Sequence, residues 1–201
     1  MTHAIASPLP QPILPIIRMG HPTLRRVAEP VSFPLSENLK QLADTMVATM
    51  LAAPGVGLAA PQVNVPLRML VYSVPAARID DDQKVQPLGP QVLINPELKP
   101  LSDDIEYGPE GCLSIPGLKG QVPRYTHLGY RGMDLDGQTV EGEAFGFHAR
   151  VLQHEVDHLD GVLYLDRMDD MESLAYLDVL MELEADAAAQ ALADHEACEE
   201  D

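Results

Sequence analysis

The chain has 201 residues, of which 46% are hydrophobic and 22% charged, as expected for one compact domain with a sizeable core. No apolar run approaches the ~20 residues of a membrane-spanning helix, and the N-terminus lacks the basic and apolar regions of a signal peptide. These features predict a cytoplasmic protein without a membrane partner. The two cysteines are too few for a disulfide framework.

The formal net charge of -18 is distributed unevenly along the chain. Residues 169–201 contain 12 acidic residues and no lysine or arginine, which leaves residues 1–168 with 13 basic and 19 acidic residues. We therefore expect a main domain over residues 1–168 and an acidic, helical C-terminal extension over residues 169–201. A surface of this sign repels phosphate groups, which argues against DNA as a partner.

The first predicted element is an amphipathic helix over residues 36–51, with apolar residues at helical spacing and Ser36 as its N-cap. From residue 56 to about residue 142, short apolar runs alternate with clusters of proline, glycine and aspartate. This pattern predicts short, mostly antiparallel strands. Within this region, residues 80–91 have the composition of an exposed loop, and the Asp-Gly pair at 136–137 is typical of a hairpin turn.

Two further helices are predicted, over residues 144–160 and residues 171–192, again from apolar residues at three- and four-residue spacing. In the last helix, Leu174, Leu177 and Met181 form an apolar stripe that we expect to pack on the domain. The elements together predict an α+β fold. In this fold, short, mostly antiparallel strands pack around a central helix, with further helices at the N-terminal and C-terminal ends.

The central predicted helix contains the sequence His-Glu-Val-Asp-His. At positions i and i+4 of a helix, His154 and His158 point to one region of space, and Glu155 is close enough to reach a water at a metal there. Neutral imidazoles suit Zn, Fe or Ni, and the carboxylate can take a proton from an activated water. This HExxH signature predicts a hydrolytic metal centre. The alternative, an exposed pair of histidines, is weaker because apolar residues lie on both sides.

A hydrolytic metal centre also needs a third protein ligand and one open position. A metzincin would have a histidine where this chain has Tyr164, so that class is excluded. A thermolysin-like peptidase would use a downstream glutamate such as Glu182, although glutamates are expected in the acidic extension. Cys112 is the other candidate, although a lone cysteine is more often a small buried hydrophobic residue. From the residues alone, the third ligand stays open between Glu182 and Cys112.

Three segments together resemble the peptide deformylases: GVGLAAPQ at 55–62, EGCLS at 110–114 and QHEVDH at 153–158. They occur in the order and spacing of that family, and similar flanks extend the resemblance over roughly residues 14–168. The resemblance implies that the main domain is a deformylase catalytic domain. Such an enzyme removes the formyl group from the N-terminal formylmethionine of nascent polypeptides and releases formate. A thermolysin-like peptidase is the alternative function.

The resemblance also implies roles for the residues of the second and third segments. It implies that Cys112, His154 and His158 hold one divalent metal ion, Fe(II) in the first place, with Zn(II), Ni(II) or Co(II) also accepted by such a ligand set. It implies that Glu155 is the general base and acid. The remaining histidines are expected to be surface or locally bonded side chains: His3, His21, His127, His148 and His195.

Further roles concern the substrate. By resemblance, Gln62 and the backbone N–H of Leu113 bind the formyl oxygen as it gains negative charge, and Glu110 pairs with Arg124 to brace the second segment. The candidates for the methionine-binding slot are Val56, Phe147 and Val151, with Gly57 allowing close approach of the substrate chain. The expected partners are N-formylmethionyl nascent peptides and, transiently, the ribosome. Some bacterial deformylases dock there through a basic C-terminal helix, whereas this extension is acidic.

Overall fold

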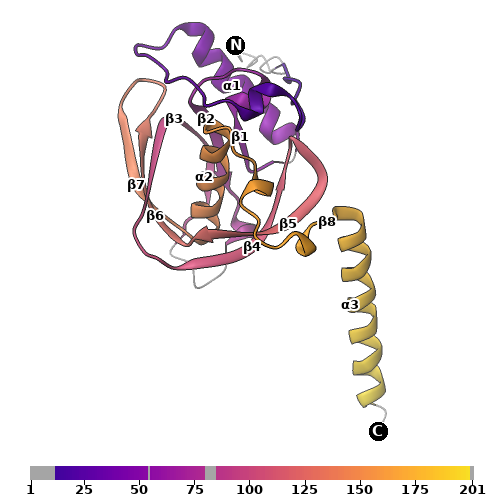
Figure 1. The fold of residues 1–201 in the computed structure, drawn as a ribbon. Helices are drawn as coiled ribbons and strands as arrows, with labels where there is room; N and C mark the ends of the chain where they lie inside the picture. The colour runs from indigo at the N-terminus through magenta and orange to yellow at the C-terminus, as the bar shows by residue number, and fades with distance from the viewer. Residues whose placement is uncertain (1–11, 54, 80–84, 200–201) are drawn as a thin grey trace, which may run out of the picture.

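The computed structural model describes residues 12–53, 55–79 and 85–199, with side chains up to residue 191. Figure 1 shows a body of strands and two helices from which a third helix projects. Among the described residues, no helix has both the length and the apolar character needed to cross a membrane. The helices are α1 (Glu37–Ala52), α2 (Gly146–Leu159) and α3 (Leu177–Glu199). The strands are β1 (Gly57–Ala59), β2 (Met69–Val74), β3 (Leu88–Pro100), β4 (Ile105–Cys112), β5 (Ile115–Tyr125), β6 (His127–Met133), β7 (Thr139–Phe145) and β8 (Ala175–Tyr176).

The strands form two sheets, of order β1-β2-β3-β6-β7 and β4-β5-β8. Neighbouring strands are antiparallel throughout both sheets, which confirms the predicted α+β class. The predicted hairpin is also confirmed, because β6 pairs with β7 and Gly137 between them has a φ of 77°. In the predicted loop over residues 80–91, however, β3 already begins at Leu88, which pairs with Val74. Residues 80–84 of that loop lie outside the described part.

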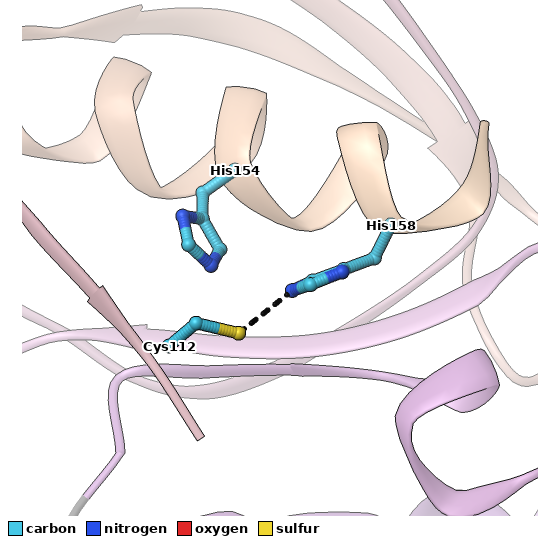
Figure 2. A group of neighbouring side chains, drawn as sticks. All are labelled: Cys112, His154 and His158. Carbon is cyan, nitrogen blue, oxygen red and sulfur yellow. Dashed lines mark hydrogen bonds between the residues drawn. The ribbon is translucent and has the colours of Figure 1, made fainter. Parts of the chain in front are cut away.

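The two helices of the body agree closely with their predicted limits. α1 follows the predicted N-cap, since the Oγ of Ser36 accepts a hydrogen bond from the N–H of Leu39 at 3.4 Å. α2 is followed by Gly161 with a φ of 73°, the left-handed conformation that glycine adopts without steric cost. His154 and His158 therefore lie one turn apart near the end of α2, and Figure 2 shows their side chains on the same side of the helix.

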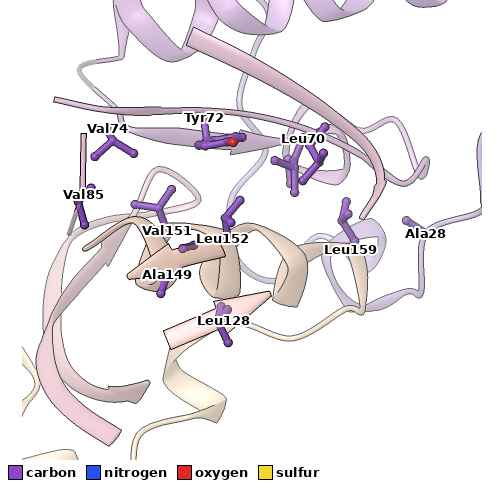
Figure 3. Packing of buried hydrophobic residues seen from close by; sticks show 13 residues of the cluster. Ala28, Leu70, Tyr72, Val74, Val85, Leu128, Ala149, Val151, Leu152 and Leu159 are labelled. Atoms are coloured by element: carbon purple, nitrogen blue, oxygen red, sulfur yellow. The ribbon is translucent and has the colours of Figure 1, made fainter. Parts of the chain in front are cut away.

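The core is built on both faces of β2, whose six residues are all buried. Leu70 and Tyr72 pack with Leu152 of α2 on one face (Figure 3), while Met69 and Val71 belong to the cluster formed with α1 on the other. A strand covered on both faces has no solvent-facing position, which explains why five of its six residues are hydrophobic, with Ser73 the exception. Each large side chain buried there contributes about 1.5–3 kcal/mol. This packing fixes α2, and with it the two histidines, on the sheet.

The C-terminal segment differs from its prediction. A 3₁₀ turn (Met171–Ser173) and β8 come first, so α3 begins only at Leu177. Leu174 packs in the small cluster beneath β5, but Met181 is 60% exposed and α3 projects from the body (Figure 1). The expected packing of the whole stripe on the domain was therefore wrong. The large apolar residues of α3 are spread around its first two turns instead of forming one face: Leu177, Val179, Leu180, Met181 and Leu183.

A buried histidine of α2 makes the stability of the fold depend on pH. The ring of His148 stacks on Tyr72 and meets Tyr130 edge-on, and its Nε2 has no hydrogen-bond partner among the described residues. Burial lowers the pKa of His148 to about 4. In the unfolded chain a histidine has a pKa of about 6.5, so the unfolded state binds this proton more readily. The resulting stabilisation is complete above pH 6.5 and is lost as the pH falls toward 4.

Replacing His148 by phenylalanine is expected to remove this contribution. Between pH 7 and pH 4, the free energy of unfolding of the wild-type protein should fall by about 3 kcal/mol more than that of His148→Phe. Urea unfolding curves at the two pH values measure the difference. Equal falls for the two proteins would show that His148 takes up its proton as readily in the folded state as in the unfolded chain.

Candidate active site

Three side chains converge between β4 and α2 (Figure 2). The Sγ of Cys112, at the end of β4, lies 3.2 Å from the Nε2 of His158, and one ligand atom from each of Cys112, His154 and His158 lies within 4.8 Å of the others. Across the described ranges, this is the only group of three or more histidine, cysteine or acidic side chains placed to hold a metal ion. Glu182, the rival third ligand, lies exposed on α3 and outside this group.

The hairpin between β4 and β5 presents Cys112 to the two histidines. Cys112 pairs with Ile115, and the register shifts between Gly111 and Cys112, so the chain bends where the thiol emerges. The N–H of Ser114 donates to the sulfur at 3.4 Å and the side-chain amide of Gln62 at 3.5 Å. Such donors stabilise negative charge on sulfur, the form in which cysteine binds metals.

Behind the ligand group lies a buried network of charged side chains. The Oε2 of Glu110 lies 2.8 Å from the Nδ1 of His154, so Nε2 is the ring nitrogen left for a metal. Arg124 donates two hydrogen bonds to Glu110 at 2.9 Å and one to Asp157 at 2.6 Å, and Arg150 donates to Glu110 at 3.0 Å. The expected Glu110–Arg124 pair is therefore confirmed. The network joins the strand that carries the cysteine to the helix that carries the histidines, and such partners orient ligand side chains.

The electrostatics of this network shift the pKa values of the two histidines in opposite directions. Burial opposes protonation of His154, but hydrogen bonding to Cys112 and Glu110 raises its pKa well above the usual value. Burial likewise opposes ionisation of Glu110, yet hydrogen bonds from Arg124 and His154 lower its pKa to about 2. Burial and the positive charges of His154 and Arg124 lower the pKa of His158 well below its usual value, which favours the neutral imidazole that binds a metal. One thiolate and two imidazoles form a ligand set that fits a divalent metal ion.

Glu155 lies beside the ligand group and not within it. Its side chain is buried, and its Oε2 has no hydrogen-bond partner in the described part of the chain. Burial raises the pKa of Glu155 to about 7, a value suited to a group that takes and returns a proton near neutral pH. Gly57 provides the space for this carboxyl group, because a Cβ at that position would lie 2.1 Å from the Oε1 of Glu155.

A single pocket of about 410 Å³ connects these groups. The Oε1 of Gln62 accepts a hydrogen bond from the N–H of Ala59 at 2.8 Å, and its amide nitrogen therefore faces the pocket and the Oγ of Ser114 at 3.2 Å. Leu113 lines the same wall. The pocket also brings together the four residues expected to bind substrate: Val56, Gly57, Phe147 and Val151.

Three residues around the site were missed by the sequence analysis. Arg150 lies four residues before His154, so helical spacing alone could have placed it on the same face of the helix. Asp157 lies within the third motif, but its pairing with Arg124 depends on a strand distant in sequence. Leu177 lines the pocket from the C-terminal segment, for which no local pattern predicted such a position.

Replacing Gly57 by alanine is expected to lower turnover about tenfold or more with retention of metal. The added Cβ would lie 2.1 to 2.8 Å from three atoms of the Glu155 side chain, so this side chain must move, and misplacement by about 1 Å can cost ~100-fold. Turnover and metal content should be compared with those of Gly89→Ala, where no atom lies within 4 Å of the added Cβ. Full turnover in Gly57→Ala would show that Gly57 is not needed to position the Glu155 side chain.

The fold and the site first indicate a class: an α+β protein with a Cys-His-His group that could hold a metal ion beside a buried glutamate, the arrangement expected of a metallohydrolase. Residues 13–174 match the family model described as polypeptide deformylase. Peptide deformylase 1 of Bordetella pertussis is 50% identical over 156 residues, covering 77% of this chain and 87% of the relative. Peptide deformylase 2 of Ralstonia nicotianae is 49% identical over 159 residues, covering 79% and 88%. The chain belongs to the peptide deformylase family.

Solved structures agree with this assignment. A class I type b peptide deformylase from Acinetobacter baumannii with Met-Ala-Ser bound has a TM-score of 0.72 at 41% identity, covering 79% of this chain and 99% of that one. The peptide deformylase of Thermotoga maritima has a TM-score of 0.71 at 38% identity with the same coverage. The protein is therefore a hydrolase that removes the formyl group from N-terminal formylmethionine. The thermolysin-like alternative is not favoured, because the matched family is that of the deformylases and, among the described residues, Glu182 lies outside the group of Cys112, His154 and His158.

Proposed function

We propose that Cys112, His154 and His158 bind the metal ion required for deformylation, and that the native ion is Fe(II). The observation that supports this most strongly is the convergence of one sulfur and two imidazoles beside a buried carboxyl oxygen that has no hydrogen-bond partner among the described residues. When bound, a divalent metal supplies Lewis acidity toward a carbonyl oxygen and lowers the pKa of a water. Zn(II), Ni(II) and Co(II) suit the same ligand set, so availability decides among them.

The remaining steps are proposed for side chains of this chain. Glu155 takes a proton from the attacking water and returns it to the departing amine, a role for which its raised pKa is suited. The amide of Gln62 and the backbone N–H of Leu113 donate to the formyl oxygen as negative charge develops there. Each donor of this kind contributes about 3 kcal/mol to lowering the barrier. The products are formate and a free N-terminal methionine.

The methionine side chain is proposed to lie against Val56, Phe147 and Val151, with the substrate backbone passing close to Gly57. All four residues line the pocket, and three of them offer the apolar surface that a thioether side chain requires. The Met-Ala-Ser bound to the related Acinetobacter enzyme supports an N-terminal methionine as the occupant. These residues would then determine the preference for the first residue of the substrate.

The setting of the reaction is proposed from the substrate and the charge of the chain. Because formylated chains arise during protein synthesis, the enzyme is expected to act in the cytoplasm and to associate transiently with the ribosome. Residues 1–168 would form most of the catalytic domain, completed by the segment of the extension that pairs with β5, and the acidic residues of 169–201 would keep the extension from binding ribosomal RNA, since phosphate repels them.

The direct test measures formate release from formyl-Met-Ala-Ser together with metal content on the same sample. Protein prepared without oxygen should contain one iron per chain and release formate, and acetyl-Met-Ala-Ser should serve as the unreactive control. Protein stripped by a chelator should regain activity with Ni(II) or Co(II). Formate release that persists after complete removal of metal would contradict the proposed role of the three ligands.

A further inference from the structure

The wall of the pocket includes a residue from beyond the family match. The match ends at residue 174, yet Leu177, the first residue of α3, lines the pocket together with Leu118 of β5. The C-terminal segment therefore has two parts. Its end is an acidic helix that projects from the body (Figure 1), whereas Leu177 at the start of that helix lines the pocket.

Several contacts hold the beginning of this segment against β5. Tyr176 and Ala175 of β8 pair with Leu118 and Lys119 of β5, which adds a third strand to the β4-β5 sheet. The Oγ of Ser173 accepts a hydrogen bond from the N–H of Gln121 at 3.1 Å. Leu177 directly follows the paired strand, so its backbone position is set by the sheet and not by the projecting helix.

Side chains before β8 add to this anchoring. Met168 and Leu174 lie over Gly120, where an added Cβ would come within 2.7 Å of the Met168 sulfur. Tyr107 of β4 donates a hydrogen bond to Asp169 at 2.5 Å. These contacts tie the chain to the sheet on both sides of the 3₁₀ turn that leads to β8.

The place of Leu177 in the cleft follows from the elements that line the pocket. Val56, Phe147 and Val151, proposed for the methionine, line it from the segment before β1 and from α2, whereas Leu118 and Leu177 line it from β5 and from the start of α3 directly after β8. The register shift in the hairpin brings Leu118 beside Gly111, because Gly111 pairs with Lys119 and a Cβ on Gly111 would lie 3.3 Å from the Leu118 carbonyl oxygen. Leu177 thus belongs to a different wall of the pocket from the proposed methionine slot, a wall open to the residues that follow the methionine.

We propose that Leu177 is a specificity-determining residue that favours apolar side chains among the residues that follow the methionine of the formylated peptide. Its side chain is partly exposed at 36%, and with the half-buried Leu118 it forms an apolar wall that a substrate side chain would cover. The inference rests on the proposed position of the formyl group beside Cys112. Apolar contacts of this size typically change substrate preference 10- to 200-fold.

The test compares two peptides, formyl-Met-Leu-Leu and formyl-Met-Ser-Ser, on the full-length enzyme. For Leu177→Ser, kcat/KM on the apolar peptide should fall about tenfold, mainly through KM, and the preference for the apolar peptide should fall by the same factor. Leu177→Met should restore the preference. Leu183→Ser, on the same helix but 60% exposed and away from the pocket, should retain it.

Melting temperatures of all variants report folding separately from preference. An unchanged preference for the apolar peptide in folded Leu177→Ser, or an equal loss of that preference in Leu183→Ser, would overturn the role of Leu177. Turnover by the wild-type enzyme in the same assay would leave the proposed active site standing. Absence of formate release by the metal-loaded wild-type enzyme on both peptides would instead overturn the proposed active site, and this inference with it.

Discussion

Cys112→Ala is expected to lose most of the bound metal and to reduce turnover at least about a thousandfold. The substitution removes one of three ligands and the only negatively charged one, and losing the Lewis acid withdraws several kcal/mol of transition-state stabilisation. It also leaves the amide of Gln62 and the N–H of Ser114 without the sulfur they contact. Metal per chain, formate release and melting temperature are the measurements.

Two variants control this experiment. Cys198→Ala removes the other cysteine of the chain and should keep both metal and turnover. Glu182→Ala removes the carboxylate that a thermolysin-like site would require, and should also keep both, since Glu182 is exposed on α3. If Cys112→Ala retained one metal per chain while Glu182→Ala lost it, the proposed ligand set would be wrong.

The sequence predicted those parts of the site whose geometry depends only on residues that are neighbours along the chain. His154 and His158 meet because four residues make about one helical turn. Glu155 is only one residue after His154, so helix geometry turns it about 100° away. Cys112 could not be placed by this reasoning, because its approach to the histidines depends on the pairing of β4 with β5 and on the packing of α2. Only the resemblance to a family distinguished it from Glu182.

The buried charge network shows a second limit of sequence patterns. An arginine and an aspartate on a helix are usually solvated, so nothing local marks the half-buried Arg150 as a partner of Glu110 or the buried Asp157 as a partner of Arg124. Burial of such charges is tolerable only when each finds its partner. That condition is met here by residues from β4, β5 and α2 together.

The fold class was predictable because strand and helix patterns are local. How the C-terminal segment lies on the domain was not predictable. Helix-forming residues predicted α3, but their spacing gives no single apolar face, so the helix has no surface with which to pack. The two-residue strand β8 has no recognisable pattern. It forms because the edge of β5 offers unpaired backbone groups to the chain that follows Ser173.

Glu155→Gln is expected to keep the metal and to lose turnover at least ~100-fold, a typical value for a general acid and base. Glutamine has the shape of glutamate but cannot take a proton from water, so the change tests proton transfer alone. The ligands and the Glu110 network are untouched, and burying a neutral amide costs less than burying a carboxylate. The melting temperature should therefore stay constant or rise while activity falls, as expected for a site strained in favour of function. Metal content, kcat and melting temperature are compared with those of Glu182→Gln, an exposed glutamate that should change none of them. Loss of metal in Glu155→Gln would indicate that Glu155 is itself a metal ligand. Retained turnover would assign the proton transfer to another group.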